Sequence, residues 1–278
     1  MSDTVAERVQ PERGRLSILL AVTLMSITLF RIVELPTLNW GVLQIFGSPL
    51  GFAFGGGALL TLLVVGLVAT GTLAILQDHP YRENQERPLL FALITPSFGA
   101  LITSIFILQT TTWPLWLAAL LTSGVMIGIL VHLSYQALSP RSPGYPGART
   151  LLNIFDYLMG FALFSLILGR QGRALVTSPA VLLVSGLLAV ELLSATGVDI
   201  RRVLLYGGTI GLLASELAWV LGYWPISSWT AATMLTVGLY IWSGIGYQHL
   251  LERLNRQIIA EFVAIGLLMF VLVLWIRP

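Results

Sequence analysis

Nine long apolar runs, separated by short polar segments, constrain this chain more than any other feature of its sequence. A helix needs about 20 apolar residues to cross a hydrocarbon core of roughly 30 Å. The chain has 278 residues, of which 56% are hydrophobic and 10% charged, whereas about 25% of residues are charged in soluble domains. We therefore predict an all-α, polytopic transmembrane helix bundle, with a polar tail at residues 1–14 and a single transmembrane domain over residues 15–278.

The predicted spans follow these apolar runs. The first span follows a basic segment, but it is long and lacks a small-residue cleavage site, so we interpret it as a retained anchor. A Gly- and Pro-rich stretch at residues 40–57 comes before the second span and includes its first residues. The nine spans cover about residues 16–35, 54–76, 89–108, 115–138, 151–168, 179–196, 203–222, 230–250 and 258–276.

Arginine is concentrated in alternate connecting segments. With the N-terminus in the cytoplasm, eleven arginines fall in cytoplasmic segments and four in outer segments. Because positive charge is retained on the cytoplasmic side, this asymmetry predicts a cytoplasmic N-terminus and a multi-pass protein of a bacterial cytoplasmic (inner) membrane. The same juxtamembrane charge explains the pI of about 9.1, so we expect the lipid bilayer, and no nucleic acid, as a partner.

Two absent residue types narrow the chemistry. All 15 basic residues are arginine, and cysteine is absent. Lysine Schiff bases, phosphate-loop lysines, thiol catalysis and thiolate metal sites are therefore excluded. The chain also lacks the H-E-x-x-H and G-x-S-x-G patterns and paired aspartates of the D-D-x-x-D type. No metal site is predicted, the cofactor is unknown, and a lipid-modifying enzyme without a familiar motif stays possible.

A short repeat places a glutamate within each of two spans. Gly186-Leu-Leu-Ala-Val-Glu191-Leu matches Gly211-Leu-Leu-Ala-Ser-Glu216-Leu closely. The two spans run in opposite directions, so Glu191 and Glu216 are expected at different depths. A carboxyl group inside a membrane is costly and is usually paired, protonated or directed into a cavity. The pair thus indicates either a proton relay or cation site, or protonated glutamates that bond neighbouring helices.

Three further polar residues are expected near the cytoplasmic side, namely Asp156, Glu261 and His132. With Glu191 and Glu216 they form the candidate intramembrane polar site. Asp156 and Glu261 are equally explained by the helix dipole, which favours acids in first turns, and His132 by a hydrogen bond at a helix interface. Pro96 is predicted to kink its span and to free a carbonyl group that could line a cavity.

The segment from Glu216 to Glu261 carries a family resemblance. Its features are Trp219, the sequence Tyr223-Trp-Pro, and Gly244-x-x-Tyr247-Gln-His249-Leu followed by Arg253. These residues resemble the C-terminal half of an uncharacterised bacterial family of polytopic membrane proteins. The resemblance implies a membrane protein and brings no known activity.

Three functional hypotheses follow. The first is a non-catalytic subunit or scaffold of a larger membrane complex, with other membrane protein subunits as partners. The second is a transporter or proton-coupled channel that uses the intramembrane carboxyl groups, which must then converge on a cavity. The third is a membrane-embedded, lipid-modifying enzyme with a pocket beside two or more of His132, Asp156 and Glu191. Intramembrane acids are compatible with all three.

Overall fold

The computed structural model describes residues 13–33, 38–45, 48–80, 88–170 and 174–275. They belong to two compact units: unit 1 (Met1–Glu83 and Pro96–Ala148) and unit 2 (Asn84–Thr95 and Arg149–Pro278). Apart from its last two residues, the predicted polar tail at residues 1–14 lies outside the described residues. The single transmembrane domain over residues 15–278 stays a prediction.

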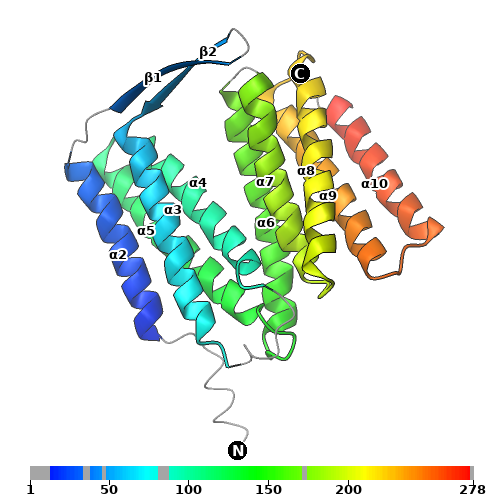
Figure 1. Cartoon of the computed structure of the whole chain (residues 1–278), viewed down its shortest axis with the longest axis horizontal. Helices are drawn as coiled ribbons and strands as arrows, with labels where there is room; N and C mark the ends of the chain where they lie inside the picture. The colour runs from blue at the N-terminus through cyan, green and yellow to red at the C-terminus, as the bar shows by residue number, and fades with distance from the viewer. Residues whose placement is uncertain (1–12, 34–37, 46–47, 81–87, 171–173, 276–278) are drawn as a thin grey trace, which may run out of the picture. The chain divides into compact units, whose positions relative to one another are not determined.

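Unit 1 is built mainly from helices (Figure 1). These are α2 (Arg13–Ile32), α3 (Gly56–Gln77), α4 (Ile94–Leu108, whose first two residues belong to unit 2) and α5 (Trp113–Gln136). α2 packs along both α3 and α5. Glycines permit this approach, because a Cβ atom on Gly124 or Gly128 of α5 would lie 3.1 or 3.3 Å from a leucine side chain of α2. The Gly124/Gly128 spacing therefore acts as a small-residue packing motif.

A β-hairpin precedes α3 and was not part of the helical prediction. Strand β1 (Leu38–Ile45) pairs antiparallel with β2 (Ser48–Phe54), with Ile45 opposite Ser48 and Leu38 opposite Phe54. The register shifts between Asn39 and Val42. Glycine and proline in this stretch indicated a break between spans, but gave no strand alternation from which the hairpin could be predicted.

Unit 2 begins with the 3₁₀ turn η2 (Phe91–Leu93). The remaining helices are α6 (Tyr145–Gly169, whose first residues belong to unit 1), α7 (Ala174–Ser194), α8 (Ile200–Gly222), α9 (Ser228–Leu250) and α10 (Arg256–Trp275). α7 lies along α8, and α9 contacts α7, α8 and α10. Ser227 caps α9, since its Oγ accepts a hydrogen bond from the Thr230 amide at 3.1 Å.

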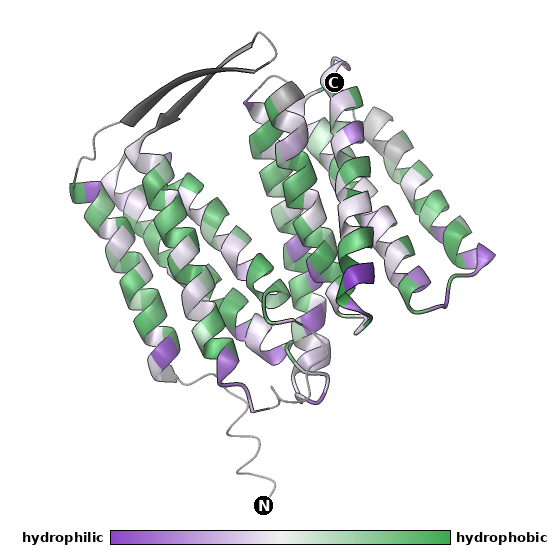
Figure 2. Ribbon diagram, in the orientation of Figure 1, coloured by the Kyte–Doolittle hydropathy of each residue, from purple (hydrophilic) through white to green (hydrophobic). Residues whose placement is uncertain are grey.

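Seven helices of the described residues are long and apolar enough to cross a membrane, by length and composition. They are α2, the segment Phe91–Leu108 that contains α4, and α3, α5, α6, α7 and α8. Figure 2 shows hydrophobic residues along most of their length and hydrophilic residues mainly near their ends. The predicted helical, multi-pass membrane architecture is thus confirmed at this level, while the count of nine spans, the cytoplasmic N-terminus and the bacterial inner membrane stay predictions.

Glycines bring α7 and α8 into close contact. A Cβ atom on Gly211 would lie 2.8 Å from the Leu182 carbonyl oxygen and 3.1 Å from the Gly186 Cα, and one on Gly207 would lie 3.2 Å from the Gly186 carbonyl oxygen. The first residue of each copy of the sequence repeat, Gly186 and Gly211, therefore meets the other across this interface. The backbones approach because neither glycine carries a side chain.

Two helices begin five or six residues earlier than predicted. α6 begins at Tyr145 instead of Leu151, because Pro146 occupies the second helical position, where its missing N–H costs no hydrogen bond. Asp156 consequently lies well inside α6, and the explanation of this acid by a first-turn dipole is wrong. α7 begins at Ala174 and contains Pro179, which was predicted to start the span. Pro96 lies in the first turn of α4, directly after η2, and the kink stays a prediction.

A buried histidine follows the end of α3 in unit 1. His79 is only 3% exposed, and its ring centroid lies 4.5 Å from that of Tyr135. Burial lowers the pKa of His79 below its ordinary value of 6.5, because the charged imidazolium is poorly solvated there. The unfolded chain therefore binds a proton at this position more readily than the folded chain.

Unit 1 is accordingly expected to lose stability in acid. As pH falls below about 6.5, protonation of the unfolded state draws the equilibrium away from the folded state until the lowered pKa is passed. Thermal unfolding of the detergent-solubilised chain between pH 8 and about pH 5 measures this loss. We expect His79→Phe to reduce it, and an identical pH dependence in His79→Phe would contradict the assignment.

Candidate functional site

Glu191, near the end of α7, forms a buried ion pair with Arg149 of α6. Arg149 Nη1 donates to Glu191 Oε1 at 3.0 Å, and Arg149 Nη2 donates to Glu191 Oε2 at 3.1 Å. Glu191 is 1% exposed and Arg149 is 8% exposed. This two-bond geometry matches the planar guanidinium to the planar carboxylate and fixes both side chains.

The same guanidinium also closes the C-terminal end of α7. Arg149 Nη2 donates to the main-chain carbonyls of Glu191 at 3.2 Å and Leu192 at 3.1 Å. Ser194 Oγ donates to the Glu191 carbonyl at 2.6 Å. Carbonyls in the last turn of a helix have no partner within the helix, and a cation there also complements the helix dipole. Arg149 thus joins the beginning of α6 to the end of α7.

Asp156 is a second, fully buried carboxyl group beside this pair. It lies seven residues after Arg149, about two turns along the same face of α6. Its Oδ1 accepts a hydrogen bond from Thr95 Oγ1 at 2.7 Å, and the carboxyl group interacts electrostatically with Glu191 and Arg149. Its Oδ2 has no hydrogen-bond donor among the described residues. One guanidinium balances only one carboxylate, so a proton shared between Asp156 and Glu191 would leave the cluster neutral.

The structure therefore brings together two of the predicted site residues. Glu191 and Asp156 share one buried cluster, whereas Glu216 of α8 and Glu261 of α10 are exposed. His132 of α5 lies 2.9 Å from the Gln136 side-chain nitrogen, one turn further along the same helix, and its predicted position at a helix interface stays a prediction.

The partners of these acids were not predicted. Three prolines in the loop before Arg149 indicated that this arginine lies in a cytoplasmic loop. Thr95 belongs to no motif in the sequence. A usable signal existed for Arg149, since a glutamate within a span requires a cation or a proton, and Arg149 lies at the predicted membrane end that Glu191 also approaches.

A family model described as protein of unknown function (DUF5656) matches residues 36–276. The predicted match to an uncharacterised family is thus confirmed over most of the chain, while the bacterial origin and membrane nature of that family stay predictions. No curated protein and no solved structure matches.

Proposed function

The chain belongs to the family of unknown function DUF5656, and we propose that it is a non-catalytic subunit of a larger membrane complex. The observation that carries this proposal is Glu216, an exposed carboxyl group within the apolar helix α8. Glu216 lies five residues beyond the middle of α8, or about 8 Å along the helix. It therefore falls inside a hydrocarbon core whose half-thickness is roughly 15 Å.

Glu216 belongs to an exposed stripe of α8. Apart from the adjacent Gly208 and Thr209, the residues of this stripe recur every three or four positions, as one face of a helix requires. They are Leu205, Gly208, Thr209, Leu212, Glu216, Trp219 and Tyr223. The opposite face contacts α7 through Gly207 and Gly211. Within the part of the chain that the structure describes, Glu216 has no ion pair and no side-chain hydrogen bond.

A carboxyl group that faces lipid is rare, because acids within membranes nearly always face a protein interior or a partner. We infer that a helix of another membrane protein covers this stripe and donates a hydrogen bond or a positive charge to Glu216. A symmetric second copy fits less well. All copies share one orientation in the membrane, so a two-fold axis along α8 would bring Glu216 against Glu216.

The buried cluster supports a structural role for the other half of the sequence repeat. Arg149 donates hydrogen bonds to the Glu191 carboxylate and to two main-chain carbonyls of α7. Such a closed arrangement fixes helix positions and leaves no donor of this set directed at a substrate. A scaffold subunit requires this rigidity.

Cross-linking tests the proposal directly, because the chain has no cysteine and one introduced thiol is unique. Leu212→Cys places a thiol one turn from Glu216 at a position that is 55% exposed and keeps the glutamate. After labelling with a photoreactive maleimide in native membranes, we expect one dominant adduct with a second protein. Adding Glu216→Leu should remove most of this adduct, since the partner loses its acceptor.

Leu183→Cys on α7 is the matched control, with 61% exposure and an apolar environment. We expect only lipid adducts from this position. Lipid adducts alone from Leu212→Cys, a homodimer adduct, or a link within the same chain would each contradict the proposed heteromeric interface.

Proton-coupled transport is a second candidate, favoured by the unsatisfied Oδ2 of buried Asp156 beside Glu191. In this hypothesis Asp156 and Glu191 exchange one proton, and the positive charge of Arg149 balances whichever of the two carboxyl groups is ionised. Two of its four proposed acids, Glu216 and Glu261, are exposed instead of gathered with these residues. Proton uptake by liposomes that contain the purified chain alone, with loss in Asp156→Asn, would favour this function over a subunit role.

A further inference from the structure

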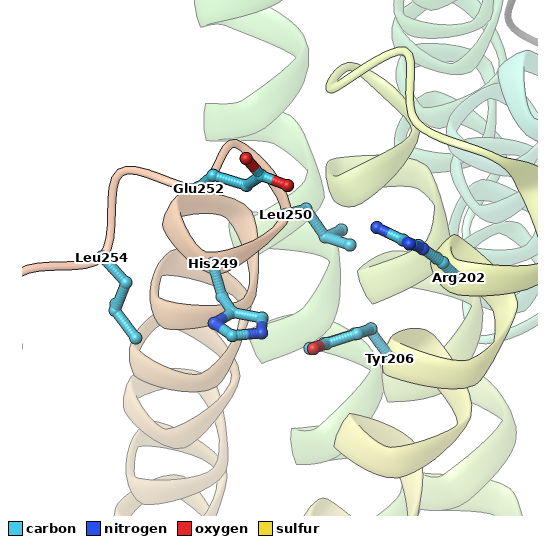
Figure 3. A pocket seen from close by; sticks show the side chains of 6 residues that line it. All are labelled: Arg202, Tyr206, His249, Leu250, Glu252 and Leu254. Atoms are coloured by element: carbon cyan, nitrogen blue, oxygen red, sulfur yellow. The ribbon is translucent and has the colours of Figure 1, made fainter.

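A pocket of about 500 Å³ lies in unit 2, where α8 begins and α9 ends. It is lined by Arg202, Tyr206, His249, Leu250, Glu252 and Leu254. Figure 3 shows the Arg202 guanidinium and the Glu252 carboxylate directed toward the space between the two helices from opposite sides. The proposed subunit function does not use this pocket.

Opposite charges and an aromatic pair characterise this pocket. Arg202 and Glu252 are both exposed, and neither forms an ion pair within the described residues. The rings of Tyr206 and His249 lie beside this pair, below it in Figure 3, with centroids 5.7 Å apart. The pocket thus offers a cation and a phenol on the α8 side and an anion on the α9 side. A complementary ligand carries a negative and a positive group a short distance apart.

Glu252 occupies an unfavourable backbone position. It follows the α9 C-cap Leu251 with a φ of 57°, the only positive φ of a non-glycine residue in the described ranges. Its amide donates to the His249 carbonyl at 3.0 Å, and the Arg253 amide donates to the Gln248 carbonyl at 3.0 Å. This helix-ending turn usually contains glycine, which adopts positive φ without steric cost. A glutamate here carries strain that glycine would avoid, which points to a role for its side chain.

The position of the pocket selects the type of ligand. It lies at the ends of α8 and α9, where the chain passes from apolar helix to a segment with exposed Arg201, Arg202 and Arg253. Leu250 and Leu254 supply apolar surface at its edge. Lipid headgroups occupy this depth, above acyl chains that contact apolar helix faces.

We propose that this pocket binds the headgroup of a zwitterionic aminophospholipid. Arg202 and the Tyr206 hydroxyl bind the phosphate, and Glu252 accepts hydrogen bonds from the primary amine. His249 packs beside Tyr206 and limits the depth of the headgroup. A purely anionic headgroup would leave Glu252 against negative charge, and a quaternary ammonium would have no N–H to donate.

Lipid titration of the purified full chain tests this proposal. The delipidated protein is titrated in neutral detergent with dioleoyl phosphatidylethanolamine, dioleoyl phosphatidylglycerol, dioleoyl phosphatidylcholine or free phosphoethanolamine, and bound lipid is counted by native mass spectrometry. We expect the phosphatidylethanolamine to bind about tenfold more tightly than the other two lipids. Free phosphoethanolamine should compete weakly, because it lacks the acyl chains; competition equal to that of the lipid would identify a soluble ligand and overturn the lipid assignment.

Variants separate binding from folding. Arg202→Ala should weaken phosphatidylethanolamine binding about tenfold, whereas Arg201→Ala, next to the pocket but outside its lining, should not. Glu252→Gly should abolish the preference over phosphatidylglycerol while the melting temperature stays equal or rises, since glycine relieves the positive φ. Glu252→Asn, which also tolerates this conformation, provides a second test.

Three further results would overturn the assignment. They are equal or tighter binding of phosphatidylglycerol by the natural chain, an unchanged lipid preference in both Glu252 variants, and equal losses in Arg201→Ala and Arg202→Ala. The last result would reduce the site to general attraction between the arginine-rich surface and phosphate groups.

Discussion

Replacing Arg149 with methionine is expected to destabilise unit 2 by about 3–5 kcal/mol, the usual cost of removing one partner from a buried ion pair. The Glu191 carboxylate, 1% exposed, would lose its cation, the Leu192 carbonyl would lose the donor from Arg149, and the Glu191 carbonyl would keep only the hydrogen bond from Ser194. Methionine keeps much of the side-chain volume. The loss of stability therefore measures the missing charge and hydrogen bonds, and not the creation of a cavity. Equilibrium unfolding in mixed micelles measures the change.

Two further variants control this result. Arg149→Met combined with Glu191→Met should recover most of the lost stability, because the Glu191 carboxylate is no longer left without its cation. Arg201→Met removes an exposed arginine of the same unit and should change stability little. Equal stability of Arg149→Met and the natural chain would show that the pair contributes nothing to the α6–α7 connection.

A valine at Gly211 is expected to separate α7 from α8 and to cost about 1–3 kcal/mol or more, as overpacking usually does. A Cβ atom there would lie 2.8 Å from the Leu182 carbonyl oxygen, which belongs to the backbone and cannot move alone. Gly208→Val is the control in the same helix, since nothing lies within 4 Å of a Cβ atom at Gly208. The helix propensity change is the same in both, so their difference in unfolding free energy isolates the close contact. Equal losses would contradict the proposed backbone approach.

The helices were predictable because a membrane imposes one requirement on every span, about 20 apolar residues that satisfy their own backbone hydrogen bonds. Helix ends were less predictable. Proline residues indicated a loop before Leu151, yet Pro146 suits the first turn of a helix, and α6 begins at Tyr145. The hairpin at Leu38–Phe54 was not predicted, because the required length of a membrane span says nothing about the structure between spans.

The repeat shows why the surroundings of its two glutamates could not be predicted from the sequence. In each copy the glutamate follows the glycine by five residues, a rotation of about 140° around the helix. Both glycines lie at the α7–α8 contact, so each glutamate points elsewhere. In α7 the glutamate forms an ion pair with Arg149 of α6, and in α8 it is exposed. Equal local sequences thus gave one buried and one exposed acid, a difference that depends on neighbouring helices and cannot be read from either copy.

The most direct test of the proposed subunit function is the native mass of the protein after gentle extraction from its own membrane, with every co-purifying chain identified. We expect a defined complex that contains at least one different membrane protein, and we expect Glu216→Leu to release the chain from it while its own fold persists. A natural chain that emerges as a lone monomer or a homodimer would contradict the account.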